Sequence, residues 1–104
     1  MMKYKLIFSP AFTRDLDNTF AYISQTLIAP QAAKKLMKEI DASIMNLKEF
    51  PEMHPLCQEP LDELGYRKII IKNYVLIYFV DKSEKTVNLL RCFYGKSDYM
   101  KFFR

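Results

Sequence analysis

The sequence predicts an α+β fold in which a helical hairpin packs on one side of a small antiparallel sheet. Three observations predict it. Residues 65–80 read as two strands that fold back on each other around Lys72 and Asn73. A further apolar run at 86–94 follows a short polar link and completes an antiparallel meander. Upstream, two apolar stripes with three- and four-residue spacing predict two amphipathic helices, whose shared apolar face the sheet would cover.

The chain begins with an expected strand over residues 4–8. Ser9 and Pro10 then provide the N-cap and the first residue of a helix, because the missing N–H of proline costs nothing there. This helix is expected over about residues 10–27. Its apolar stripe consists of Phe12, Leu16, Phe20, Ile23 and Leu27.

A second helix is expected to start at Pro30, after a link long enough only for a turn. Pro51 should end it just after Phe50, because proline cannot continue a helix. The second apolar stripe consists of Ala33, Leu36, Met37, Ile40, Ile44 and Leu47. Two consecutive helices with so short a link predict an antiparallel hairpin.

Residues 51–65 contain three prolines and no sustained periodicity, which predicts a loop with one helical turn near 60–64. This loop is the best candidate in the chain for a mobile segment. The expected order of elements is therefore β-α-α-β-β-β, followed by a tail from Gly95 to Arg104. The 104 residues are expected to form one domain.

The composition excludes several classes of function. Two glycines leave no phosphate-binding glycine loop. Cys57 and Cys92 stand in unrelated contexts, without the clustered cysteines and histidines of a metal site, so reduced thiols are expected. No apolar run has the length of a signal peptide or a membrane span. The expectation is a cytoplasmic protein without a metal, a small-molecule cofactor or a membrane partner.

The positive charge is concentrated in the second part of the chain. Residues 1–65 carry seven Lys/Arg and nine Asp/Glu, for a net charge of −2, whereas residues 66–104 carry nine and three, for +6. Such a field favours an anionic partner, either nucleic acid or an acidic polypeptide. The same charge is equally consistent with a basic protein that has no such partner.

Short motifs spread over nearly the whole chain, in their order and spacing, carry a family likeness. They are Ser9-Pro10-Ala11, Asp15-Leu16, Tyr22-Ile23, Pro30-x-x-Ala33-x-x-Leu36, Leu47-x-x-Phe50-Pro51, Tyr66-Arg67, Asn73-Tyr74-x-Leu76-x-Tyr78 and Leu90-Arg91-x-x-Tyr94-Gly95-Lys96-x-Asp98-Tyr99. Together they resemble the RelE/ParE superfamily of bacterial type II toxins. The resemblance implies a toxin that arrests growth and is neutralised by an acidic, partly disordered antitoxin.

The resemblance leaves two targets open: RelE-like toxins cleave mRNA in the ribosome, and ParE-like toxins poison DNA gyrase. RelE-like cleavage implies a cluster of Lys and Arg with a C-terminal Tyr. Arg67 matches one position of that cluster, but Ile69, Val75 and Ser97 stand where further cations would be expected. These departures favour the ParE-like side, so whether the chain is an enzyme stays open. A degenerate, non-toxic antitoxin-binding module is the third possibility.

Two overlapping sets of residues follow from this reading. The residues expected to bind the target or the antitoxin are Arg67, Lys68, Lys72, Arg91, Lys96 and Tyr99. A rearranged nuclease would instead use Arg67, Arg91, Tyr94 and Tyr99. The only histidine, His54, is expected to be a solvated loop residue more often than a general base.

The central expectation is an electropositive hollow on the sheet, formed by cations and phenols. Arg67 begins its strand beside the loop, where exposure is easy, so it is the best single choice for a functional cation. Arg91 is expected to lie between Leu89 and Phe93 on one face of its strand. An internal ion pair between Arg91 and a helix carboxylate such as Asp15 is an equally weighted alternative. Tyr99 has an alternative as well, which is packing of the tail back on the core.

Overall fold

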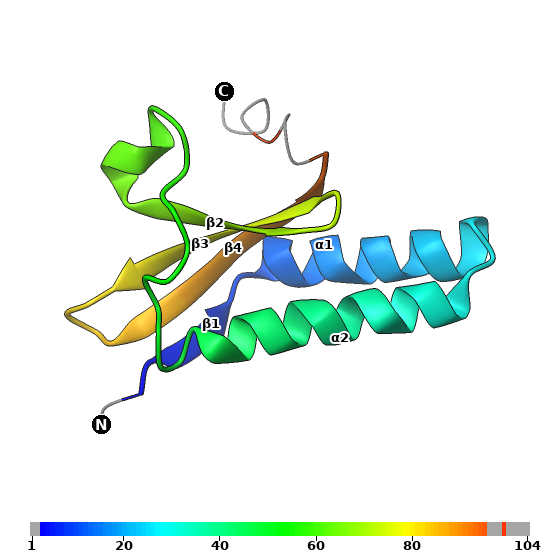
Figure 1. Ribbon diagram of the computed structural model, residues 1–104, viewed down its shortest axis with the longest axis horizontal. Helices are drawn as coiled ribbons and strands as arrows, with labels where there is room; N and C mark the ends of the chain where they lie inside the picture. The colour runs from blue at the N-terminus through cyan, green and yellow to red at the C-terminus, as the bar shows by residue number, and fades with distance from the viewer. Residues whose placement is uncertain (1–2, 96–98, 100–104) are drawn as a thin grey trace.

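The computed structural model describes residues 3–95 and 99. Its elements follow the predicted β-α-α-β-β-β order, with one short extra helix on each side of the second long one (Figure 1). They are β1 (Lys5–Phe8), α1 (Pro10–Ala21), the π-helix η1 (Tyr22–Thr26), α2 (Pro30–Asn46), the 3₁₀-helix η2 (Leu61–Leu64), β2 (Tyr66–Ile71), β3 (Tyr74–Asp81) and β4 (Thr86–Tyr94). None of the described helices is long and apolar enough to cross a membrane.

The four strands form one sheet in the order β1-β4-β3-β2. The hairpin at Lys72 and Asn73 is confirmed, because Ile71 pairs with Tyr74 across it in the β2–β3 register. The β3–β4 pair is antiparallel too, whereas β1 runs parallel to β4, so the sheet is mixed rather than purely antiparallel. A parallel pair needs a long crossover, and here two long helices, two short ones and two strands separate β1 from β4.

Both helix starts are where the sequence predicts them. The Ser9 hydroxyl accepts a hydrogen bond from the Phe12 N–H at 3.0 Å and donates one to the Leu90 carbonyl at 2.8 Å, so the cap also fastens α1 to β4. The predicted end of α2 just after Phe50 is wrong, because the helix ends at Asn46. The chain tightens there, with the Leu47 N–H donating to Ile44 instead of continuing the i→i−4 ladder.

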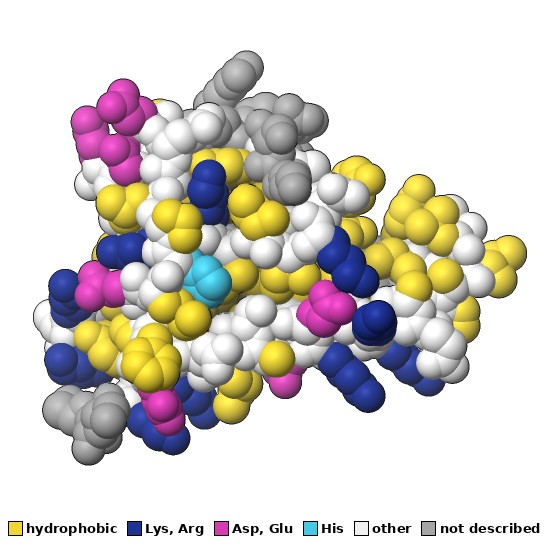
Figure 2. Space-filling view, viewed as in Figure 1, with side chains coloured by type: hydrophobic (Ala, Val, Ile, Leu, Met, Phe, Trp, Pro, Cys, Tyr) yellow, Lys and Arg dark blue, Asp and Glu magenta, His cyan; other side chains and the backbone are white. Residues whose placement is uncertain are grey.

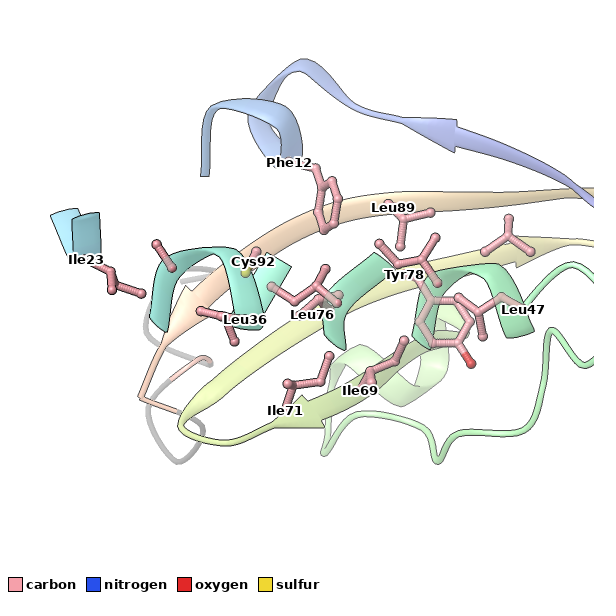
Figure 3. Packing of buried hydrophobic residues seen from close by; sticks show 14 residues of the cluster. Phe12, Ile23, Leu36, Leu47, Ile69, Ile71, Leu76, Tyr78, Leu89 and Cys92 are labelled. Carbon is pink, nitrogen blue, oxygen red and sulfur yellow. The ribbon is translucent and has the colours of Figure 1, made fainter. Parts of the chain in front are cut away.

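The main core lies between the helical hairpin and one face of the sheet (Figures 1 and 3). Burial of apolar side chains on both sides of this interface provides the main stabilisation of the fold. The buried members are Phe12, Ile23, Ala33, Leu36, Ile40, Ile44, Leu47, Ile69, Ile71, Leu76, Tyr78, Val87, Leu89 and Cys92. The predicted stripe of α2 is therefore confirmed, but the first stripe is only partly buried, since Phe20 and Leu27 are exposed.

The opposite face of the sheet, called here the outer face, carries a second, smaller core. Its buried residues are Cys57, Leu61, Val75, Ile77, Phe93 and Tyr99. Cys57 and Leu61 come from the proline-rich loop, and Tyr99 comes from the tail. Tyr99 thus packs back on the core, as the alternative expectation had it, and the sheet carries buried side chains on both faces.

Candidate functional site

Arg67 is held by the proline-rich loop. Its guanidinium donates to the His54 carbonyl at 2.7 Å and lies 3.4 Å from a Glu52 carboxylate oxygen. Only 19% of its side chain is exposed. The expectation of an easily exposed cation at this position is wrong, because the loop folds over the start of β2 and uses the guanidinium to satisfy its own carbonyl groups.

Arg91 pairs with Asp15 of α1. Its Nε lies 2.8 Å from Oδ2 and its Nη2 lies 3.2 Å from Oδ1, an arrangement with two parallel hydrogen bonds. Hydrogen bonding to Asp15 raises the pKa of Arg91. The Asp15 carboxylate also accepts a hydrogen bond from the Cys92 N–H at 2.9 Å. Cys92 comes after Leu89, the last residue of β4 that pairs with β1. The internal ion pair is therefore the confirmed alternative for Arg91.

A register shift in the β3–β4 ladder changes the neighbours that the sequence predicts for Arg91. Tyr78 pairs with Leu89 and Ile77 pairs with Arg91, which leaves Leu90 as an extra residue in β4. Leu89 therefore faces the main core, whereas Arg91 lies on the outer face, its guanidinium 4.6 Å from the ring centre of Phe93. The expectation that Leu89 and Arg91 share a face is wrong, because a bulge reverses the alternation.

The two arginines consequently lie on opposite faces of the sheet. Arg67 pairs with Tyr78 and alternates in step with Ile69 and Ile71, which belong to the main core. Arg91 lies on the outer face, and each arginine already contacts a carboxylate. The expected electropositive hollow formed by both arginines is absent from the described part of the chain.

Lys68 and Tyr99 do come together, on the outer face. The Lys68 Nζ lies 5.5 Å from the ring centre of Tyr99, within the range of a cation–π contact. Tyr99 is only 2% exposed, and its hydroxyl oxygen accepts the Gln58 N–H at 3.1 Å. A phenol engaged in this way covers the second core and is not open to a phosphodiester.

The remaining predicted residues are dispersed. Lys72 lies at the β2–β3 turn, and its Nζ is 3.6 Å from a Glu39 carboxylate oxygen of α2. Tyr94 is exposed at the end of β4, with its ring centre 5.2 Å from that of Tyr74 in an edge-to-face contact. Lys96 falls outside the described residues.

The titratable groups near Arg67 favour their neutral forms. The ring of His54 meets the ring of Tyr78 edge to face at 6.3 Å, and burial lowers the pKa of His54, so the imidazole is uncharged at neutral pH.

The two cysteine thiols are not ready nucleophiles. Burial raises the pKa of both, that of Cys92 to about 12. Within residues 3–95 and 99, no group of three or more metal-binding side chains exists.

Cleavage of RNA by its own 2′-hydroxyl requires a base, an acid and cations that converge on one phosphate. Among the residues proposed for a rearranged nuclease, Arg67 and Arg91 are on opposite faces and Tyr99 is buried. Tyr94 is exposed, but its neighbour is another phenol. The described residues of this set do not form a cleavage site.

A pocket of about 470 Å³ opens between the helical hairpin and the end of the sheet. Asn18, Thr19, Tyr22, Leu27, Tyr74 and Tyr94 line it. A second hollow, of about 510 Å³, runs beside β1 and includes Lys3, Lys5 and Lys48. Sequence reasoning missed the first pocket. The available signal was the link 27–29, Leu-Ile-Ala, which is apolar where helix turns usually carry Gly, Asn, Asp or Ser.

Comparison with known proteins gives one family. A family model described as the ParE toxin of the type II toxin-antitoxin system, parDE, matches residues 6–99. No curated protein sequence matches the chain.

Solved structures with the same fold include chains from a ParDE system, from a RelBE complex and of RelE itself. A chain of the chromosomal ParDE system from P. aeruginosa has a TM-score of 0.72 at 20% identity, covering 89% of this chain and 97% of that one. A chain of the toxin-antitoxin complex RelBE2 from Mycobacterium tuberculosis has a TM-score of 0.64 at 19% identity, covering 89% and 99%. A mutant of E. coli RelE in the free state has a TM-score of 0.60 at 20% identity, covering 98% and 92%. At this level of identity the likeness concerns the fold.

Proposed function

This chain belongs to the ParE toxin family of type II toxin-antitoxin systems, and from that membership we propose that it arrests bacterial growth by inhibiting DNA gyrase. A cognate acidic antitoxin neutralises it, and both meet in the bacterial cytoplasm. Inhibition without cleavage requires a binding surface, not a reacting group.

The separation of the two arginines carries the proposal. A ribonuclease of this fold needs its cations on one side of the scissile phosphate, and here Asp15 and Glu52 hold Arg91 and Arg67 on opposite faces. Moving Arg67 to the other face would break its contacts with Glu52 and the His54 carbonyl, and moving Arg91 would break its ion pair with Asp15. The geometry thus favours gyrase over mRNA as the target.

The proposed contact surface relies on the lysines of the predicted set and not on its two arginines. Arg67 and Arg91 stabilise the fold, so their contribution to binding is indirect. Lys72, whose side chain is 54% exposed, and Lys68 at the outer face remain available to a partner. Tyr99 stays in the proposed set because its ring positions Lys68, and Lys96 stays in it on the sequence alone.

The test follows two readouts after induced expression in a bacterium. We expect plasmid supercoiling to fall early while translated transcripts stay intact by primer extension, and purified toxin to inhibit supercoiling by purified gyrase. Co-expression of the neighbouring reading frame should restore growth. Cuts in translated messages that precede any change in supercoiling would establish the mRNA interferase instead. Normal growth at confirmed soluble expression would establish the non-toxic antitoxin-binding module.

A further inference from the structure

The tip of the helical hairpin, residues 22–29, projects past the end of the sheet (Figure 1). It is unusually apolar for a connection between two helices. Tyr22, Leu27 and Ile28 are all exposed there, Ile28 by 82%. Ile23 of this segment is buried in the main core, but these three exposed side chains are not part of it, which points to contacts outside the chain.

The backbone of the tip is strained. Ile28 has a φ of +51°, a left-handed conformation that suits Gly or Asn and is costly for a β-branched side chain. The preceding turn, η1, is a π-helix, a form that is rare and frequent at functional sites. Strained residues persist where function retains them, and glycine would relieve this strain. An isoleucine at this strained and exposed position therefore points to a role for its side chain.

The pocket described above lies directly beside this tip. Tyr22 and Leu27 of the tip form one side, and Tyr74 and Tyr94 at the end of the sheet form the other. Burial and the neighbouring phenols raise the pKa of Tyr74, so its hydroxyl stays neutral. The pocket of about 470 Å³ has three phenols and a leucine in its lining, so it has room for a large apolar side chain together with part of the segment that carries it.

The charge around the tip has one sign. Residues 18–38 contain Lys34, Lys35 and Lys38 but no Asp or Glu. The α2 helix begins at the tip without an acidic residue in its first turn or a side-chain cap, so its positive end is uncompensated. Glu39, the next acid, already lies 3.6 Å from Lys72. Figure 2 shows hydrophobic side chains on the projecting tip and Lys or Arg side chains along the α2 side.

We propose that the hairpin tip and the adjacent tyrosine pocket form the docking surface for an acidic segment of the antitoxin. One aromatic or branched apolar side chain of that segment fills the pocket and packs on Ile28. Its carboxylates face Lys34 and Lys35. The proposal rests on the antitoxin partner proposed above and adds where the acidic segment is held. Complementary charge brings the segment in, and the apolar anchor sets the affinity.

The test is calorimetric titration of the full-length toxin with the protein encoded by the neighbouring reading frame. Ile28→Asn keeps the left-handed backbone and removes the apolar side chain, and Tyr94→Ala opens the pocket. We expect each variant to weaken binding at least tenfold while its thermal unfolding midpoint stays near that of the parent. Leu64→Asn, at an exposed leucine on η2 that does not line the pocket, is the control and should bind like the parent.

Charge is tested separately. Lys34→Ala combined with Lys35→Ala should weaken binding several-fold at low salt and reduce the dependence of affinity on salt. Parent-like affinity in both Ile28→Asn and Tyr94→Ala would overturn the docking surface and leave gyrase inhibition untouched. If Ile28→Asn and Tyr94→Ala no longer arrest growth but bind the antitoxin as tightly as the parent, the surface binds the target instead. A parent chain that does not bind the neighbouring protein would overturn the antitoxin partner as well.

Discussion

Asp15 satisfies two groups of β4 at once. Its carboxylate binds the Arg91 guanidinium and the Cys92 N–H, at a point where β1 no longer pairs with β4. An open strand edge beside a helix needs an acceptor, because an unsatisfied amide or a half-buried unpaired cation is costly. The Asp15 carboxylate supplies both acceptors, which explains how a charged residue is accommodated in β4, where most side chains are apolar.

Replacement of Asp15 should therefore destabilise the fold strongly. We expect Asp15→Ala to lower the free energy of unfolding by about 3 kcal/mol, since it leaves the cation and the amide without their partner. Asp17→Ala, at an exposed position of the same helix, should change it by less than about 0.5 kcal/mol. Urea denaturation measures both, and equal stabilities of the two variants would contradict the role given to Asp15.

Two buried groups should make stability fall at alkaline pH. Burial raises the pKa of Tyr78 from 10.0 to about 12 and that of Cys92 from 9.0 to about 12. The fold thus favours the protonated forms, so this stabilisation is complete below about pH 9 and is lost as pH rises through 12. Urea midpoints at pH 8, 10 and 11 should fall steadily. A combined Tyr78→Phe and Cys92→Ala variant should give a flatter profile, and an unchanged slope would contradict this assignment.

The elements of this fold are joined by single contacts at their ends. Ser9 caps α1 and ties it to β4 through the Leu90 carbonyl, next to the bulge. The cap thus fixes where the first helix leaves the sheet and, with it, the position of Asp15 one turn and a half later. The Ser9 cap and the ion pair between Asp15 and Arg91 therefore both depend on where α1 begins.

Loss of the cap should be visible in stability. We expect Ser9→Ala to lower the free energy of unfolding by about 1–2 kcal/mol, because it leaves the Phe12 N–H and the Leu90 carbonyl without their partner. The comparison is Ser24→Ala, whose hydroxyl only donates back to the Phe20 carbonyl on an exposed turn. That variant should stay within about 0.5 kcal/mol of the parent in urea melts. A larger loss for Ser24→Ala than for Ser9→Ala would refute the capping role.

The whole molecule is a three-layer arrangement, with the helical hairpin, the sheet and a thin outer cover. Tyr99 closes the outer layer over Val75, Ile77 and Phe93, and Lys68 lies over its ring. Among the described residues, the packing leaves the projecting hairpin tip, the hollow beside β1 and the lysines Lys68 and Lys72 as surfaces for partners. At the scale of the whole molecule, packing therefore determines which surfaces can bind a partner.

The outer layer can be tested through Tyr99. We expect Tyr99→Ala to lower the free energy of unfolding by about 3 kcal/mol, because it removes the ring, and Tyr99→Phe by about 1 kcal/mol, because it removes the hydroxyl that accepts the Gln58 N–H. Tyr94→Ala removes a ring of the same size from an exposed site and should cost less than about 1 kcal/mol. Loss of toxicity in Tyr99→Phe at parental stability would instead point to a chemical role for the hydroxyl.

The sequence by itself determined the order of the elements and the family. Ser9-Pro10, Pro30 and the turn at Lys72 and Asn73 act through their nearest neighbours, so their effects can be read without coordinates. Periodicity likewise identified which face of α2 is buried.

Only the tertiary structure decided where the charges go. One extra residue at Leu90 turned Arg91 to the outer face, and the loop closed over Arg67, although nothing local marks either event. The partner of β1 was equally invisible in the sequence, and the apolar link 27–29 marked the hairpin tip without showing which tyrosines form the pocket beside it. They depend on contacts between residues far apart in the chain, and ion pairs and packing form only once the backbone has brought those residues together.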